Sequence, residues 1–199
     1  MTGVPMRTLL LAILVGYGLG SIPFALILAR RFRGIDLRRR GSGNVGAANA
    51  FRTTGMLLGV GALALDLGKG AATVLLVERL SAGAGATMPT AAGLAAVTGH
   101  VYPVWLRFQG GKGVATFVGV FIGIFLEAAI VFGLIWLVVA AGTRYSSLAA
   151  LCATAGVVLF YAVTGWVGLP VITAMAVLIF LKHHENIRRL VAGQEGKIG

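Results

Sequence analysis

The feature that most constrains this chain is a succession of apolar segments, each close to the length that crosses a lipid bilayer. A helix needs about 20 apolar residues to span the hydrocarbon core. Short polar connections separate the candidate segments, which cover residues 8–29, 55–80, 90–106, 114–141, 147–163 and 169–182. Only 12% of the 199 residues are charged, against about a quarter in soluble domains. We therefore predict an all-α integral membrane protein in which residues 1–199 form a single polytopic domain.

The number of spans depends mainly on the run at 114–141, which is too long for one upright helix. Glu127 lies midway along it, so we divide the run into two shorter helices with a turn near that residue. The stretch at 55–80 is broken near its middle by the sequence LDLGKG. This division predicts seven short transmembrane helices, and five long tilted helices are the alternative.

The basic residues predict how the protein lies in the membrane. Cytoplasmic loops of membrane proteins carry an excess of Lys and Arg. In the seven-span arrangement Arg7 and Arg79 lie on one side, Lys69 lies within a span, and the other 14 of the 17 basic residues lie on the opposite side. We therefore expect the N-terminus outside and the C-terminus in the cytoplasm. This distribution also explains the net charge of +11 without nucleic-acid binding.

Glycines at small-xxx-small spacing indicate close contacts between spans. The chain has 30 glycines, among them the pairs Gly16/Gly20 and Gly119/Gly123. Small residues at this spacing let helix backbones approach each other in lipid. We expect most of these glycines to be packing positions.

Three polar, glycine-bearing stretches fall on the predicted cytoplasmic side, and the first is GSGNVGAANAFRTTG at 41–55. Glycine allows backbone N–H groups to approach an anion closely. Ser42, Asn44 and Asn49 add neutral donors. Arg52 adds a planar guanidinium suited to phosphate. The stretch is interpreted either as an anion site or as a flexible loop whose Ser and Asn cap helices.

The second stretch, RFQGGKGVAT at 107–116, contains clustered glycines around a single lysine. It is not a Walker A loop, because Gly113 follows Lys112 and Leu106 stands where the first glycine belongs. A glycine loop that opens onto a helix N-terminus is nevertheless a good anion site, since free N–H groups and the helix dipole both favour negative charge. The alternative is that Lys112 only anchors the topology.

The third stretch is KHHENIRRLVAGQEG at 182–196. His183 and Asn186 are three residues apart and share a helix face if the last span continues through them. We interpret Arg188 and Arg189 mainly as interfacial anchors for anionic lipids. In the second span, Asp66 and Lys69 are expected to neutralise each other, because intramembrane charges are costly and usually paired.

A shortage of acidic residues narrows the possible chemistry. The chain has six acids, and none lies in the first two glycine stretches. This composition excludes a metal-dependent phosphotransferase built on clustered aspartates, so we predict no metal site. The pattern His-x-x-x-x-Asp of acyl-CoA acyltransferases is also missing. A cationic, donor-rich site predicts anionic substrates.

The chain resembles the PlsY-type acyl-phosphate:glycerol-3-phosphate acyltransferases of bacteria. The segments that carry the resemblance run in the family's order and cover nearly the whole chain: GSIPFALILAR, GSGNVGAANAFR, LDLGKG, GHVYPVWLRFQGGKGVAT, TRYSSL and HHENIRRLVAGQE. The resemblance implies a multi-pass enzyme of the bacterial cytoplasmic (inner) membrane with its active site facing the cytoplasm. It also implies transfer of an acyl chain from acyl phosphate to the 1-hydroxyl of glycerol 3-phosphate. The products would be lysophosphatidic acid and phosphate, and no cofactor is implied.

The same resemblance assigns roles to particular residues. The implied catalytic residues are Ser42, Lys112 and His183, and the implied substrate-binding residues are Asn44, Arg52, Gly111, Gly113, Ser147 and Asn186. We assign the glycine loop to the acyl phosphate. The residues expected to hold the phosphate of glycerol 3-phosphate are Arg52, Lys112, His183 and Asn186.

Two questions of mechanism and class stay open at this point. The base that deprotonates the attacking hydroxyl is either His183 or the phosphate of the substrate, and we favour the substrate phosphate with His183 as a phosphate ligand. An acyl-enzyme on Ser42 is the less favoured route, because no residue is an obvious activating base beside it. The alternative class is a transporter or flippase for an organic phosphate, which the nearly featureless outer loops SAGAGATMPT and TGWVG disfavour.

Overall fold

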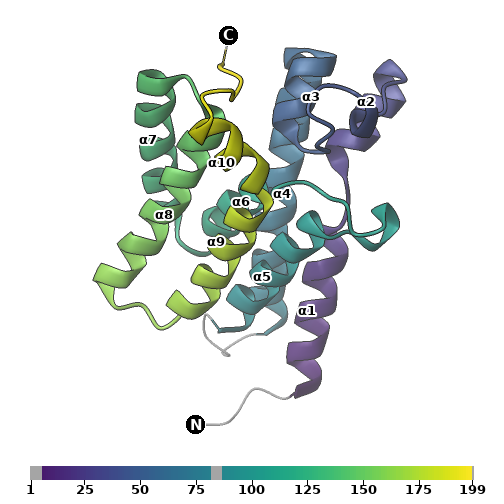
Figure 1. The fold of residues 1–199 in the computed structure, drawn as a ribbon. Coiled ribbons are helices and arrows are strands. Elements are labelled where there is room, and N and C mark those ends of the chain that lie inside the picture. Colours follow the sequence, from purple (N-terminus) through teal and green to yellow (C-terminus); the bar gives the residue numbers. More distant parts are fainter. Residues whose placement is uncertain (1–5, 82–86, 199) are drawn as a thin grey trace.

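The computed structural model describes residues 6–81 and 87–198, and these residues form α-helices, two single-turn 3-10 helices and no β-strand (Figure 1). The elements are α1 (Met6–Gly20), α2 (Phe24–Arg33), η1 (Leu37–Arg39), α3 (Ala47–Thr54), α4 (Met56–Leu80), α5 (Thr87–Val101), η2 (Val104–Leu106), α6 (Val114–Ile124), α7 (Leu126–Thr143), α8 (Ser146–Thr164), α9 (Leu169–Lys182) and α10 (His184–Val191).

Several of these helices have the length and composition of membrane spans. Within the described part of the chain, four stretches are long and apolar enough to cross a bilayer, namely Met6–Arg33, Met56–Leu80, Leu126–Thr143 and Ser146–Thr164. The helices Val114–Ile124 and Leu169–Lys182 are apolar but shorter. The expected all-α membrane architecture is therefore confirmed for the described residues, while the total of seven spans and the orientation of the termini stay predictions.

The first predicted span, 8–29, is not one continuous helix. It breaks between α1 and α2, because Pro23 has no N–H to continue the ladder and the Ser21 hydroxyl donates to the Tyr17 carbonyl oxygen at 2.6 Å. Such a hydroxyl-to-backbone bond competes with helix continuation. The break leaves the carbonyl of Ile22 available, and the Lys69 Nζ donates to it at 2.8 Å.

The expected interruption of the second span by LDLGKG does not occur in the backbone, because α4 runs unbroken through it. Asp66 and Lys69 are buried and lie 2.8 Å apart as an i,i+3 pair, as expected. Mutual neutralisation allows a charged pair to remain inside a helix without ending it. The charges therefore interrupt the apolar pattern but not the helix.

The other helix boundaries follow local backbone chemistry. Helix α5 ends at Val101, five residues before the predicted end of the span at 90–106, since the residue before Pro103 is disfavoured in a helix. The run at 114–141 is divided at Phe125, which has an extended backbone. The predicted turn near Glu127 is therefore confirmed to within two residues.

Close helix contacts occur at the glycine pairs that the spacing singled out. A Cβ at Gly20 of α1 would overlap the backbone of Ala96 in α5, and a Cβ at Gly119 of α6 would overlap the carbonyl of Leu67 in α4. These glycines let backbones touch in the way expected of membrane helices. The prediction that they are packing positions is confirmed.

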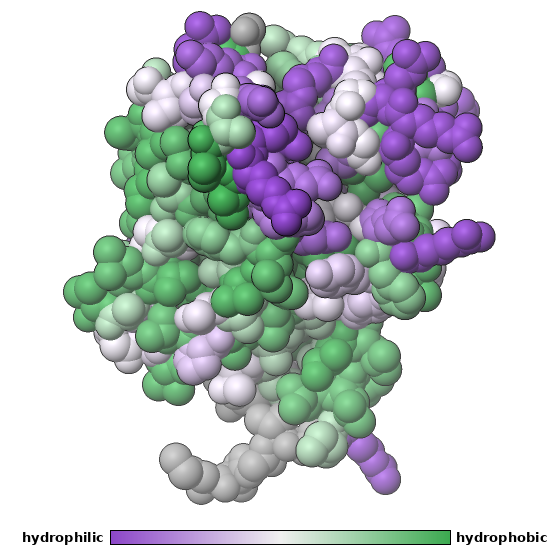
Figure 2. Space-filling model, viewed as in Figure 1, coloured by the Kyte–Doolittle hydropathy of each residue, from purple (hydrophilic) through white to green (hydrophobic). Residues whose placement is uncertain are grey.

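Polar residues gather at one end of the bundle. Figure 1 shows α3 and α10 at the end opposite the start of α1, and Figure 2 shows hydrophilic side chains concentrated at that same end above a hydrophobic body. The three glycine-bearing stretches all contribute to this polar end or to the region just below it.

Candidate active site

The loop of the first stretch, which precedes α3, is organised by a buried asparagine. The Asn49 side chain is 1% exposed, and its Nδ2 donates to the carbonyl oxygens of Leu37 at 3.1 Å, Arg40 at 3.0 Å and Asn44 at 2.8 Å. Its Oδ1 accepts the backbone N–H of Ser42 at 3.0 Å. Sequence reasoning considered Asn49 only as one more neutral donor, whereas the structure gives it the central position in the loop.

The predicted site residues of this first stretch, two in the loop and one on α3, are less enclosed. Asn44 uses its Oδ1 to accept the N–H of Gly46 at 2.9 Å, so part of this side chain is committed to a turn. Ser42 and Arg52 are exposed. Their side chains are therefore free to approach a ligand at the polar end of the molecule.

The glycine loop of the second stretch packs against the end of α5. The N–H of Gly110 donates to the carbonyl of Val101 at 3.1 Å, and the N–H of Gly111 donates to the carbonyl of His100 at 3.0 Å. Gly113 has a φ of +87° and is the N-cap of α6, a backbone conformation that favours glycine. The loop thus delivers Lys112 directly before a helix N-terminus, where free N–H groups favour an anion.

Lys112 joins the second stretch to the third. Its Nζ donates to the Asn186 Oδ1, across the contact between the glycine loop and α10. Burial lowers the pKa of Lys112 to about 8, the Glu195 carboxylate opposes this change, and the charges of Arg189 and Arg52 add to it. The lysine is therefore a partly desolvated cation surrounded by other cations, which is a strong attractor for an anion.

Glu195 organises the third stretch and was missed by sequence reasoning. Its Oε1 accepts from the Ser147 hydroxyl at 2.6 Å and from the Asn186 Nδ2 at 2.6 Å, and its Oε2 accepts from the Arg189 Nε at 2.7 Å. Burial raises the pKa of Glu195, but these three hydrogen bonds outweigh burial and lower it. An ionised carboxylate thus holds Asn186, which in turn holds Lys112.

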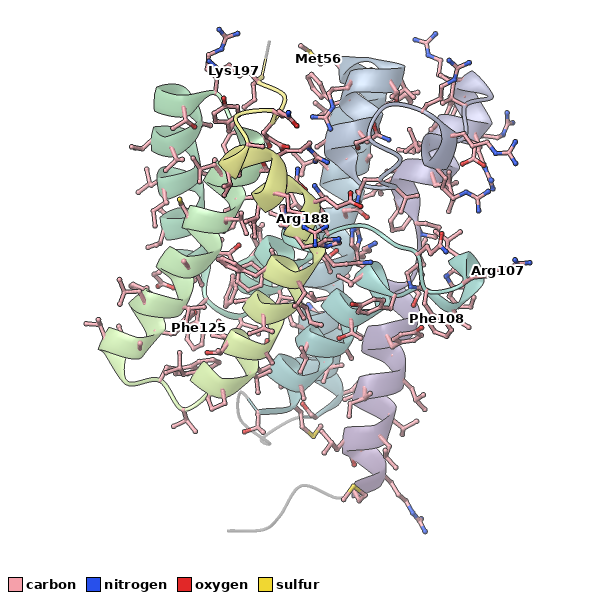
Figure 3. The ribbon with its side chains drawn as sticks, in the orientation of Figure 1. Met56, Arg107, Phe108, Phe125, Arg188 and Lys197 are labelled. Carbon is pink, nitrogen blue, oxygen red and sulfur yellow. The ribbon has the colours of Figure 1, made fainter. Side chains whose placement is uncertain are left out.

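This network corrects the interpretation of Arg189 as a simple lipid anchor. Its guanidinium is paired with Glu195, and a second carboxylate, that of Glu185, lies 4.0 Å away. Ser147, expected to touch substrate, is buried and donates to Glu195. Arg107 does fit the role of a topology residue, because its side chain is exposed and points away from the bundle (Figure 3).

His183 lies at the junction of α9 and α10. The last span therefore does not continue as one helix to Asn186, which was the condition for the two residues to share a helix face. The side chain is buried, and its Nδ1 lies 2.8 Å from the carbonyl oxygen of Ile179. A carbonyl only accepts, so Nδ1 carries the proton and Nε2 is unprotonated in the neutral ring. Burial, with the charge of Lys112, lowers the pKa of His183 to about 4.

The structure therefore joins Lys112, Asn186 and Ser147 into one hydrogen-bonded chain through Glu195. His183 makes no hydrogen bond within this chain, but the charges of Lys112 and Glu195 act on it. Ser42 and Asn44 belong to the separate loop before α3, and Arg52 lies in the last turn of α3, at the same polar end. Among residues 6–81 and 87–198, no group of three His, Cys, Asp or Glu side chains is placed to hold a metal ion. Fold and site together define a helical membrane protein with a group of cationic side chains at one end of its bundle.

Known proteins are similar to this chain in both sequence and fold. The family model described as glycerol-3-phosphate acyltransferase matches residues 10–193. The glycerol-3-phosphate acyltransferase of Nitrobacter winogradskyi is 50% identical over 96% of both chains, and that of Bradyrhizobium diazoefficiens is 46% identical over 94% of both. The chain belongs to the glycerol-3-phosphate acyltransferase family, in which the PlsY-type resemblance placed it.

Solved structures agree with this membership. The crystal structure of PlsY (YgiH), an integral membrane glycerol 3-phosphate acyltransferase, in its glycerol 3-phosphate form matches with a TM-score of 0.90 at 41% identity over 96% of both chains. The lysophosphatidic acid form matches with a TM-score of 0.88 at 40% identity, over 96% of this chain and 95% of that one.

Proposed function

We propose that this enzyme transfers a fatty acyl group from acyl phosphate to the 1-hydroxyl of glycerol 3-phosphate, giving lysophosphatidic acid and inorganic phosphate. The observation that carries the proposal is Lys112, a partly desolvated cation in a glycine loop that opens onto α6 and is held by Asn186. Both substrates are phosphate-bearing anions, and one of them has an acyl tail that suits an apolar helical bundle. PlsY in complexes with glycerol 3-phosphate and with lysophosphatidic acid supports the acceptor and the product.

The site offers two groups of phosphate ligands. The N–H groups at the start of α6, from Gly113 onward, would hold the phosphate of the acyl donor, while Gly111 shapes the loop through its N–H bond to the His100 carbonyl. Arg52, Lys112 and Asn186 would hold the phosphate of glycerol 3-phosphate, with Ser42 and Asn44 as further donors. Ser147 acts through Glu195, because its hydroxyl donates to that carboxylate.

Direct attack suits this site better than an acyl-enzyme. Acyl phosphate already carries a good leaving group, so cationic and N–H donors need only stabilise the developing oxyanion and the departing phosphate. The attacking hydroxyl must lose a proton. Burial and the charge of Lys112 lower the pKa of His183 to about 4 and make it a poor base, which leaves the acceptor's own phosphate as the proposed base.

His183 then has a role other than that of the main base. In the neutral ring its Nε2 accepts a hydrogen bond, whereas a phosphate oxygen also accepts. The expected phosphate contact of His183 would therefore need a proton on Nε2 that burial disfavours. We assign Nε2 to the second hydroxyl of glycerol 3-phosphate, whose hydrogen bond it accepts, so that the single proton of the attacking hydroxyl stays available to the phosphate.

The enzyme is placed, as a proposal, in the bacterial inner membrane with its active site in the cytoplasm. The basic residues support this orientation, because 14 of the 17 lie on the predicted cytoplasmic side and cytoplasmic loops carry an excess of Lys and Arg. In this location the donor enters from the bilayer and glycerol 3-phosphate enters from water.

The proposal is tested by the choice of acyl donor. Purified protein in lipid is given labelled glycerol 3-phosphate with palmitoyl phosphate, palmitoyl-CoA or palmitoyl-acyl carrier protein, and labelled lysophosphatidic acid is measured. We expect product from palmitoyl phosphate without added metal or CoA. Product from a thioester and none from palmitoyl phosphate would overturn the proposed donor.

A further inference from the structure

After α10 the chain reverses direction and returns to the start of α8. Gly193, two residues after the helix, has a φ of +67°, a conformation that glycine adopts without steric cost. The N–H of Gln194 donates to the carbonyl of Arg189 at 2.7 Å, which closes the turn. The segment 195–198 then lies beside residues 144–147, where α7 ends and α8 begins.

The contacts between these two segments follow one antiparallel register. They are a backbone hydrogen bond, a cation–π contact and a side-chain hydrogen bond, made by the pairs Arg144 with Ile198, Tyr145 with Lys197, and Ser147 with Glu195. Each step forward along the first segment is thus matched by a step back along the second. Exposed contacts of this kind are individually weak, so their common register is what gives the segment a defined place.

Arg144 makes the largest share of these contacts. Its carbonyl accepts the N–H of Ile198 at 2.7 Å, and its Nε and Nη2 donate to the Ile198 carbonyl at 3.1 and 2.9 Å. One arginine therefore holds both backbone polar groups of Ile198. Both side chains are exposed, so burial of apolar surface does not explain the arrangement.

The segment that Arg144 holds carries a buried member of the site. The Glu195 side chain is 8% exposed, and its Oε1 accepts from the Asn186 Nδ2 at 2.6 Å. The Oδ1 of the same asparagine accepts from the Lys112 Nζ. A continuous path of contacts thus leads from an exposed arginine to the buried lysine.

We propose that Arg144 is a positioning residue that fixes residues 195–198 along the start of α8. In this place Glu195 orients Asn186 toward Lys112. Arg144 touches no substrate and acts only through the segment that it holds. The inference rests on the proposed function where it takes Lys112 as a ligand of the glycerol 3-phosphate phosphate. Loss of Arg144 should weaken binding of glycerol 3-phosphate, whereas loss of folded protein alone lowers kcat and leaves this KM unchanged.

The pH dependence of activity also reports on this placement. Burial lowers the pKa of Lys112, and the charge of Glu195 opposes this change. The other titratable groups that act with the lysine are Glu185, Arg189, Arg52 and His183. A displaced Glu195 no longer opposes burial, so the pKa of Lys112 falls further and the lysine loses its charge at a lower pH. The alkaline fall in activity should therefore begin about half a pH unit or more lower than in wild type.

Arg144→Met tests the proposal, and Arg107→Met is its matched control. Both arginines are exposed and follow a helix with a left-handed backbone, at φ values of +62° and +51°. The Arg107 side chain makes no hydrogen bond or ion pair with the part of the chain that the structure describes. We expect Arg144→Met to raise the KM for glycerol 3-phosphate by about fivefold or more and to shift the alkaline fall. Arg107→Met should change neither.

Ile198→Pro tests the same contact without changing the arginine. Proline lacks the N–H that donates to the Arg144 carbonyl, so this variant should change the KM and the pH profile in the same direction. In the double variant it should add less than about twofold to the effect of Arg144→Met, because residues in contact are not additive. Full additivity, wild-type kinetics in Arg144→Met, or equal changes in Arg107→Met would overturn the proposal.

Cross-linking measures the position of the segment without any enzymatic activity. In a Cys152→Ala background, Tyr145→Cys and Lys197→Cys place thiols at two residues whose side chains are neighbours. A short bis-maleimide should join them, as detected by mass spectrometry, at least about fivefold more slowly when Arg144→Met is added. An equal rate would show that the segment keeps its place without Arg144 and would overturn the proposal. If wild-type protein does not use palmitoyl phosphate, the proposed donor fails, and this rate still decides the role of Arg144.

Discussion

Lys112 is the residue on which the electrostatics of the site depends. Its ammonium lies within a group of cations, and burial lowers its pKa to about 8 although Glu195 opposes this change. A lysine is charged below its pKa and neutral above it. The cation that attracts both phosphates is therefore present at neutral pH and lost in mildly alkaline solution.

This titration predicts an alkaline loss of activity. We expect kcat/KM for glycerol 3-phosphate to fall as the pH rises through about 8. Lys112→Arg keeps its charge over this range and should remove the alkaline fall even if its rate is lower. Rates are measured from pH 6 to 10 with blanks for spontaneous hydrolysis of the donor. The same alkaline fall in Lys112→Arg would contradict this assignment.

His183 gives a second prediction at the level of single residues. General-base catalysis contributes about a hundredfold or more to the rate, whereas a group that only orients glycerol 3-phosphate contributes less. We expect His183→Gln to keep its kcat within about tenfold of wild type. Steady-state kinetics with palmitoyl phosphate would measure this, and a loss above about a hundredfold would identify His183 as the base.

The role of a single residue was predictable from the sequence only where its type and its immediate neighbours were enough to indicate that role. The glycines around Lys112 and the pair His183 and Asn186 stood out because packing alone explains them poorly. Glu195 did not, although it is the sole acid after Asn186 in the sequence. Its contacts depend on the chain folding back after α10, which no local pattern encodes.

Among the helices, the close contact between α4 and α6 fixes the helix that follows the glycine loop. Gly119 faces the backbone of Leu67 with no room for a side chain. The adjoining pair of Asp66 and Lys69 lies on the same helix, α4. The position of α6, and so of its N-terminus, therefore depends on this glycine.

Gly119→Ala should destabilise the protein by about 1–3 kcal/mol, because overpacking forces the two backbones apart. Gly133→Ala on α7 is the control, since a Cβ there meets nothing within 4 Å and alanine favours the helix by up to about 1 kcal/mol. Thermal unfolding in detergent compares the two variants. Equal losses of stability would contradict the packing role.

Helix positions were predicted better than helix breaks. Each predicted apolar run overlaps at least one helix, and the turn near Glu127 was correct to within two residues. The break at Ser21 to Pro23 and the unbroken passage of α4 through LDLGKG were not predicted. Both depend on tertiary partners, because Lys69 bonds the carbonyl that the first break exposes and Asp66 neutralises Lys69.

At the scale of the whole molecule, the protein separates an apolar body from one polar end (Figure 2). The proposed orientation places that end, with α10, in the cytoplasm. It places the α8–α9 connection on the outside. Both regions contain highly exposed valines, Val191 at 87% and Val167 at 92%.

These valines allow a direct test of topology. In a Cys152→Ala background, which removes the sole native cysteine, Val167→Cys should react with an impermeant thiol reagent in spheroplasts. Val191→Cys should react only after the membrane is permeabilised. The reverse pattern would show that the orientation inferred from the basic residues is wrong.

The measurement that tests the central claim most directly is phosphate release by the purified protein given palmitoyl phosphate, with and without glycerol 3-phosphate. We predict release that requires glycerol 3-phosphate, needs neither metal nor CoA, matches the lysophosphatidic acid formed, and is lost in Lys112→Ala. Release without the acceptor would contradict direct transfer and indicate a hydrolase or an acyl-enzyme. No release in either case, with glycerol 3-phosphate still bound, would contradict the acyltransferase account and favour a transporter.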